Sequence, residues 1–253
     1  MKLAFKSIVV AAAFVAAGAA NAGTVVEAGN LATDYYFSGG TGTLTFSQTL
    51  IDALNTGGVE VIAAAPATSN IVGTPYDYTA VGVSAPVSSL TVGTGGLIEQ
   101  AQSQGGATQI ANFVKGVSYG GTISVTNLRI DMLNKNIYAD FVGAGKTSTG
   151  TTVNVNQSNV LAWTFSDIAG PTNITPGAFY TTLYTTLSGL ALTTEGFNNL
   201  KAGLGLYSIG LIALQGASTD FGTLTLAVPE PSTYALMGLG LVGMALVRRH
   251  VAK

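Results

Sequence analysis

The chain has 253 residues, no cysteine and a single histidine. Without cysteine there are no disulfides, thiolate nucleophiles or cysteine-ligated metals. The histidine, His250, lies in the C-terminal tail, so histidine-dependent nucleophiles and histidine zinc sites are excluded from the rest of the chain. We expect no metal site, no cofactor and no enzymatic activity. Among enzymes, only those that work with paired carboxylates, as glycosidases do, stay open.

Charged residues are also scarce, at 9% of the chain, and the formal net charge is −2. The basic surface that nucleic-acid binding requires is therefore missing, and no nucleic-acid partner is expected. Between Gly23 and Ala227, five lysines and arginines stand against eleven aspartates and glutamates, which gives this stretch a net charge of −6. Both ends of the chain are basic instead.

Glycine, threonine, serine, asparagine and valine are abundant, which favours short strands joined by many turns. Residues 120–143 alternate apolar and polar side chains on both sides of a turn at 134–136, and so predict a β-hairpin. Short helices are predicted at 47–58 and 193–205, where a serine and a threonine can act as N-caps. We predict a mainly β fold: a single β-sandwich-like domain with two or three short helices.

Few residues of this domain are candidates for a functional role. Trp163, the only tryptophan, lies in an apolar strand pattern and is interpreted as a core anchor, with sugar stacking as the alternative. The acids considered for a catalytic pair are Asp131 and Asp140, which flank the hairpin turn, and Asp34, Asp77, Asp167 and Asp220, which are spread elsewhere. Scattered acids are usually solvated, so the sequence alone indicates no catalytic site.

The first 22 residues have the pattern of a secretory signal peptide. Two lysines precede an apolar run at residues 8–17. Ala20 and Ala22 then give the A-x-A pattern that signal peptidase recognises, which places the cleavage before Gly23. The alternative, a retained N-terminal membrane helix, fits less well because the apolar run is short. The sequence therefore predicts export.

The last 26 residues combine an extended segment, an apolar run and a basic tail. Pro229 and Pro231 hold the chain extended, so a helix can begin only after them. The apolar run at residues 234–247 would be roughly 21 Å long as a helix, short of the ~30 Å hydrocarbon core, and predicts a marginal membrane span. Arg248 and Arg249 would then mark the cytoplasmic side.

This order of Val-Pro-Glu-Pro-Ser, a glycine-interrupted apolar run and Arg-Arg resembles the PEP-CTERM sorting signal of Gram-negative bacteria. The signal is also called the VPEP or ice-binding-protein C-terminal motif. The resemblance implies export, transient anchoring in the inner membrane, and recognition by an exosortase, a transpeptidase-like enzyme that would cut within the motif. It also implies association with exopolysaccharide, biofilm matrix or the cell surface. The alternative is a plain weak anchor behind a proline linker. The processing motif comprises Val228, Pro229, Glu230, Pro231 and Ser232.

A second resemblance concerns the body of the chain. The predicted hairpin, followed by the segment at residues 188–203, is similar in layout to HtaA-type haem-binding surface domains. Those domains use tyrosine and histidine around haem, whereas this body has no histidine. The resemblance therefore implies a shared β-rich fold more than a shared ligand. Tyr138 and Tyr180 are the tyrosines considered for iron, with ordinary strand packing as the alternative.

Two glycine patterns imitate nucleotide-binding motifs. Gly238–Gly243 fits G-x-G-x-x-G, but the chain ends ten residues later and no strand–turn–helix unit follows. Gly143–Ser148 resembles a phosphate-binding loop, but Asp140 stands where that motif needs glycine, and no helical pattern follows. Both are interpreted as coincidence.

The chain is thus divided into a signal peptide (1–22), a secreted β-rich domain (23–227) and a sorting signal (228–253). We predict an exported, exosortase-sorted protein, transiently anchored in the inner membrane and then placed at the cell surface or in the extracellular matrix. Its expected role is non-catalytic adhesion or matrix structure, with signal peptidase, exosortase and extracellular polysaccharide as partners. A haem-like ligand-binding surface module and a carboxylate-dependent glycan hydrolase are the alternatives.

Overall fold

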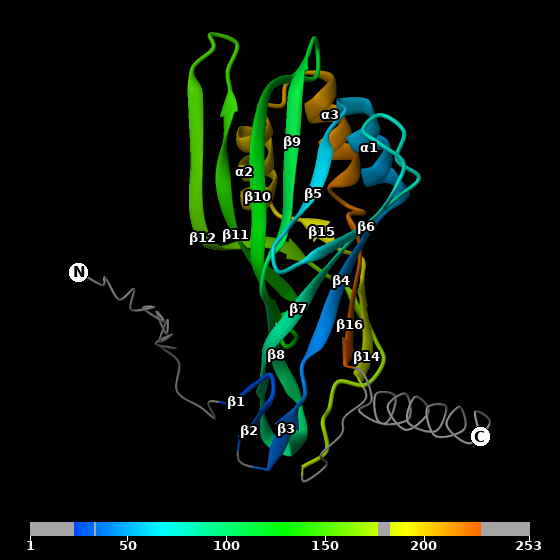
Figure 1. The fold of residues 1–253 in the computed structure, drawn as a ribbon, viewed down its shortest axis with the longest axis vertical. Helices are drawn as coiled ribbons and strands as arrows, with labels where there is room; N and C mark the ends of the chain where they lie inside the picture. Colours follow the sequence, from blue (N-terminus) through cyan, green and yellow to red (C-terminus); the bar gives the residue numbers. More distant parts are fainter. Residues whose placement is uncertain (1–22, 33, 177–182, 229–253) are drawn as a thin grey trace, which may run out of the picture.

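The computed structural model describes residues 23–32, 34–176 and 183–228 (Figure 1). The predicted signal peptide and the part of the sorting signal beyond Val228 lie outside these residues, and so does Tyr180. None of the helices in the described part is long and apolar enough to cross a membrane.

The described residues are mainly β, with three α-helices and one short 3-10 helix. The helices are α1 (Gln48–Gly57), η1 (Thr94–Gly96), α2 (Thr194–Leu204) and α3 (Ile209–Ala217). The strands are β1 (Thr24–Glu27), β2 (Asn30–Ala32), β3 (Tyr35–Phe37), β4 (Gly40–Phe46), β5 (Glu60–Ala64), β6 (Thr68–Val72), β7 (Ala80–Val92), β8 (Ile98–Ser103), β9 (Gly106–Val114), β10 (Ser118–Asp131), β11 (Asn136–Lys146), β12 (Thr152–Thr164), β13 (Asp167–Ala169), β14 (Leu183–Ser188), β15 (Ala191–Leu192) and β16 (Gly222–Val228).

Fourteen of these strands belong to one antiparallel sheet. The path through it runs β13–β14–β16–β4–β7–β8–β10–β11–β12–β15. Four further strands attach beside this path: β1 and β6 pair with β7, β9 pairs with β10, and β5 pairs with β9. Strands β2 and β3 form a separate two-stranded sheet.

The prediction of a mainly β domain with short helices is confirmed, but the β-sandwich is not: one continuous sheet curls into a half-barrel in place of two stacked sheets. The long strand β10 explains this continuity. Its residues Ser118–Thr126 pair with β9, and residues 129–131 pair with β8 along the same edge. A bulge separates the two sections, where Asn127 has a φ of 55°. A single strand thus belongs to the upper and the lower parts of the sheet at once (Figure 1).

The predicted hairpin and both predicted helices are confirmed. Strands β10 and β11 form the hairpin. Helix α1 follows Ser47, whose side chain accepts the Leu50 N–H, and helix α2 follows Thr193, whose side chain accepts the Gly196 N–H. Each helix ends at a glycine in the left-handed conformation, Gly58 after α1 and Gly205 after α2. Local capping chemistry therefore determines where these helices begin and end.

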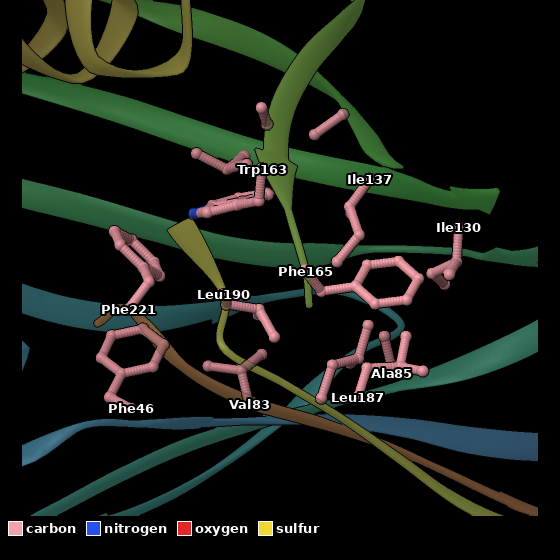
Figure 2. Close-up of a cluster of buried hydrophobic side chains, with 14 of the residues drawn as sticks. Phe46, Val83, Ala85, Ile130, Ile137, Trp163, Phe165, Leu187, Leu190 and Phe221 are labelled. Carbon is pink, nitrogen blue, oxygen red and sulfur yellow. The ribbon is translucent and has the colours of Figure 1, made fainter. Parts of the chain in front are cut away.

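The core lies between the two facing sides of the curled sheet (Figure 2). Trp163 and Phe165 come from one side of the half-barrel and face Phe46 and Val83 on the other (Figure 2). The rings of Trp163 and Phe221 are 5.2 Å apart at their centroids, in a tilted arrangement. Trp163 is 3% exposed, so its interpretation as a core anchor is confirmed and stacking of a sugar on it is excluded in this conformation.

Helix α2 packs on β10 and β11 almost backbone to backbone. A Cβ atom at Gly145 of β11 would overlap the carbonyl oxygen of Ala202 in α2. A Cβ at Gly121 of β10 would overlap the carbonyl oxygen of Gly203 in the same helix. Only glycine allows so close an approach of a helix to a sheet. Gly145, one of the two glycines that imitate a phosphate-binding loop in the sequence, therefore serves helix packing.

Helix α1 is joined to the chain ahead of β7 by a pair of hydrogen bonds. The side chain of Asn55 donates to the carbonyl of Tyr78 (2.9 Å) and accepts the Tyr78 N–H (2.8 Å). Burial raises the pKa of the Tyr78 phenol above its ordinary value, partly offset by the Val61 N–H, which donates to the phenol oxygen. The Tyr78 side chain thereby covers the outer edge of β5.

Candidate functional site

The last described residue, Val228, is also the first residue of the predicted processing motif. It ends β16, pairs with Leu183 of β14 and is buried. In Figure 1 this end of β16 lies in the lower part of the molecule, toward the end of the long axis that β2 and β3 form. Of the predicted signal-cleavage and membrane-stop residues, Gly23 alone lies in the described part of the chain, of which it is the first residue. The others stay predictions because they lie outside the described residues: Ala20, Ala22, Pro229, Glu230, Pro231, Ser232, Arg248 and Arg249.

An exposed aromatic and aliphatic surface lies at the opposite end of the long axis, around the turn between β9 and β10 (Figure 1). We call it the apical patch. It consists of Phe113, Lys115, Tyr119, Tyr207, Ile209 and Ile212. Phe113 and Ile212 are 67% and 69% exposed, the highest values among the large apolar side chains of the described residues.

The aromatic part of the apical patch is held in place by several contacts between distant parts of the chain. Phe113 lies directly opposite Tyr119 in the β9–β10 ladder. The ring of Tyr119 stacks on that of Tyr207, with 3.9 Å between centroids and 11° between planes. The Tyr207 hydroxyl accepts the N–H of Gly116 in the turn. The row of rings is therefore preorganised and loses little side-chain freedom on binding.

The aliphatic part comes from the first turns of α3. The Ile209 N–H donates to the Gly116 carbonyl (2.9 Å), which fixes the start of this helix beside the β9–β10 turn. Ile209 and Ile212 are three residues apart and lie on one exposed face, whereas Gly210 and Leu214 face inward. A surface helix normally presents polar side chains outward. The apolar outward face of α3 therefore indicates a contact surface.

An internal cavity of about 40 Å³ lies between the two sides of the half-barrel. Its walls are mainly apolar and include Phe46, Phe221 and Leu226. Two buried polar atoms on its walls, Ser103 Oγ and Trp163 Nε1, have no hydrogen-bond partner among the described residues. The volume suits two or three water molecules. It is far below the roughly 300 Å³ at which pockets for small ligands and cofactors begin, so it does not admit haem or a sugar ring.

Two of the acids considered for catalysis, Asp131 and Asp140, each have a structural role. Asp131 accepts hydrogen bonds from the N–H groups of Leu133 and Asn134, and so holds the hairpin turn. Asp140 accepts from the Asn127 side chain (3.0 Å) and from the Asn159 N–H (2.8 Å). Asn127 and Asn159 both have positive φ and lie at the β-bulges of the strands flanking β11. Asp140 therefore holds both the bulge of β10 and the bulge of β12 in place.

The described residues bring no group of three or more metal-ligating side chains together. Tyr138, considered for iron, carries the guanidinium of Arg129 over its ring at 4.4 Å from the centroid. Arg129 and Tyr138 lie opposite each other on β10 and β11, so this contact is ordinary cross-strand packing. The other tyrosine considered, Tyr180, is outside the described residues.

Residues 227–249 match the family model of the PEP-CTERM protein-sorting motif. The chain carries a PEP-CTERM sorting motif. The resemblance based on the proline–glutamate–proline segment, the apolar run and the arginines is thereby confirmed. The motif implies an exported protein that an exosortase sorts.

The chain is also structurally similar to the haem-binding protein HtaB from Corynebacterium glutamicum. The two are 13% identical, the match covers 75% of this chain and 93% of that one, and the TM-score is 0.37. This is the likeness in layout that the hairpin and the following helix suggest, and at this score it supports no conclusion about a ligand. No curated protein matches the sequence.

Proposed function

We propose that this protein works at the cell surface or in the exopolysaccharide matrix, in a non-catalytic adhesive or structural role. The observation that carries the proposal is the PEP-CTERM motif at residues 227–249, which implies export and sorting by an exosortase. The chain would be anchored in the inner membrane for a time and then released from its C-terminal helix by cleavage within the motif. Signal peptidase and exosortase are the processing partners in this proposal.

The shape of the body supports an adhesive role. The strand that leads into the sorting motif ends in the lower part of the molecule, whereas the β9–β10 turn, around which the apical patch lies, is at the top (Figure 1). An attachment at Val228 would therefore leave the patch well away from the attachment point. A surface in this position stays free to contact a partner.

The chemistry of the apical patch suits a polysaccharide. Rings such as Phe113 and the Tyr119–Tyr207 pair offer flat apolar faces against which the C–H faces of sugar rings can pack. The tyrosine hydroxyls and Lys115 add polar groups that can donate to sugar hydroxyls or acidic substituents. Lys115 is one of five cations in a body of net charge −6, so it offers an acidic glycan a rare attractive contact.

The proposal predicts that truncating the patch weakens binding to the host's exopolysaccharide. The test variant combines Phe113→Ala with Ile212→Ser, since both side chains are highly exposed and neither is part of the buried core. Because losing two anchor side chains costs at least about 2 kcal/mol, we expect the affinity to fall by roughly thirtyfold or more. Co-sedimentation of the exported protein with purified exopolysaccharide measures this.

The matched control combines Tyr184→Ala with Val72→Ser, which removes similar side chains, 65% and 54% exposed, from β14 and β6. The control is expected to bind like the unaltered protein. Equal binding by all three proteins would contradict adhesion through the patch. An equal loss in both variants would also contradict it, because binding would then not be localised at the apical end.

The non-catalytic part of the proposal is supported by the roles of Asp131 and Asp140. Both carboxylates accept backbone hydrogen bonds that hold a turn or a bulge, and each lies on a different part of the hairpin. A glycan hydrolase needs one carboxylic acid and one free carboxylate about 5–10 Å apart across a cleft. Asp131 and Asp140 are therefore not a favoured pair for a glycan hydrolase. The internal cavity is too small to favour the haem alternative.

A further inference from the structure

The outer edge of β12 differs from the other strand edges in the upper part of the sheet. Residues Thr152–Gln157 pair with β11 on one side and with no other strand of the described chain. Five of these six residues are exposed, and Val155 is the exception. By contrast, the outer edge of β5 is covered, since its Val61 N–H donates to the Tyr78 hydroxyl. Figure 1 shows β12 as the outermost strand on its side of the molecule.

This edge has few of the features that prevent an exposed strand from pairing with another chain. Those features are charged side chains, prolines, bulges and segments that cover the edge. The sequence from Thr147 to Ser166 contains no charged residue and no proline. A bulge at Ser158 and Asn159 ends the regular edge, and from Leu161 onward the chain at Thr193 covers it. The regular, uncovered section is therefore Thr152–Gln157.

The two faces of this section differ in chemistry. Gln157 accepts a hydrogen bond from Asn199 of α2, so the face with Val153, Val155 and Gln157 points toward the helix. Thr152, Asn154 and Asn156 lie on the outer face, and all three are exposed. Val153 is 39% exposed although it lies on the same face as the buried Val155. A further strand at this edge would cover it.

We propose that the Thr152–Gln157 edge pairs with the same edge of a second copy of this chain, antiparallel and about a two-fold axis at Asn154. This register places Thr152 opposite Asn156 and the exposed Val153 opposite Val155, and Asn154 faces its own copy. The uncharged edge lets two bodies of net charge −6 approach. Lys146 and Asp140 lie on the outer face of β11 near opposite ends of the edge. Antiparallel pairing brings the lysine end of each copy toward the aspartate end of the other, whereas parallel pairing would bring like charges together.

The first test measures the oligomeric state of the native protein, purified from the envelope of a host that sorts it, by size exclusion with light scattering over a range of concentrations. We expect a concentration-dependent dimer. Asn154→Lys with Asn156→Lys places four positive charges across the two-fold axis and should weaken dimerisation at least tenfold. The control, Thr45→Lys with Thr122→Lys, adds the same charge at exposed positions of the internal strands β4 and β10 and should dimerise like the unaltered protein.

The second test uses the absence of cysteine in the chain. Asn154→Cys is expected to form a disulfide-linked dimer on mild oxidation, because directly opposite strand residues have Cα atoms about 4.5–5.5 Å apart, within the range of a disulfide. Thr45→Cys, exposed on an internal strand, should give no more dimer than random collision does. A monomer at all concentrations, a dimer unaffected by the edge lysines, or equal cross-linking of the two cysteine variants would each overturn the proposal.

Discussion

Replacing Gly145 with valine is expected to destabilise the protein by about 3 kcal/mol or more, which lowers the melting temperature by roughly 6–12 °C. The new Cβ would overlap the Ala202 carbonyl oxygen, which is part of the α2 backbone and cannot rotate away. The helix would have to move off the sheet and lose its contact with β11. Valine favours strands, so local propensity opposes this effect and any loss reflects the helix contact. Thermal and urea unfolding of the purified protein measure it.

Gly216→Ala is the control for this prediction. Gly216 lies in the last turns of α3, and an added Cβ there has no neighbour within 4 Å. Replacing glycine by alanine inside a helix raises the free energy of unfolding by roughly 0.5–1 kcal/mol, so the control should be as stable as the unaltered protein or slightly more stable. A Gly145→Val protein as stable as the control would show that α2 does not approach β11 so closely.

Truncating Trp163 is expected to cost about 3–5 kcal/mol, because Trp163→Ala leaves a large void in the middle of the half-barrel. Trp163 contacts Phe221, and Phe221 in turn lies against Phe46, with ring centroids 5.2 Å and 6.1 Å apart. The substitution therefore disturbs the aromatic contact that joins the two sides of the curled sheet (Figure 2). Urea unfolding with an unchanged slope and a lower midpoint would report this loss.

Trp163→Phe separates packing from hydrogen bonding at the same position. The indole Nε1 has no partner among the described residues, so removing it should cost nothing beyond the lost ring volume. We expect a loss of about 1–2 kcal/mol, well below that of the alanine variant. A phenylalanine variant as unstable as the alanine variant would contradict this and would place a hydrogen-bond partner at Nε1.

Much of the local structure could be predicted from the sequence, because local chemistry determines it. Ser47 and Thr193 cap their helices through hydrogen bonds to residues three positions on, and the β10–β11 hairpin follows from alternation around a short turn. Helix α3 was not predicted individually, because it exposes Ile209 and Ile212 and so lacks the polar face that indicates a surface helix.

The curled sheet could not be predicted, because it depends on pairings between distant residues. Strand β10 pairs first with β9 and then with β8, and the change depends on the bulge at Asn127. Asp140 of the next strand, β11, holds this bulge through a hydrogen bond to the Asn127 side chain. The apical patch is likewise assembled from β9, β10 and α3, and the contact between Tyr119 and Tyr207 joins residues that are far apart in the sequence. The sorting motif, by contrast, is contiguous, so the sequence alone was sufficient to find it.

The central claim is that the C-terminal segment is a sorting signal that is removed. The most direct test is the intact mass and the C-terminal peptide of the native protein, taken from the envelope and from the medium of its host. The account predicts a C-terminus within Val228–Ser232, with the apolar helix and the basic tail absent, and the body in the surface or matrix fraction. A chain that still ends at Lys253 and stays in the inner membrane would contradict it.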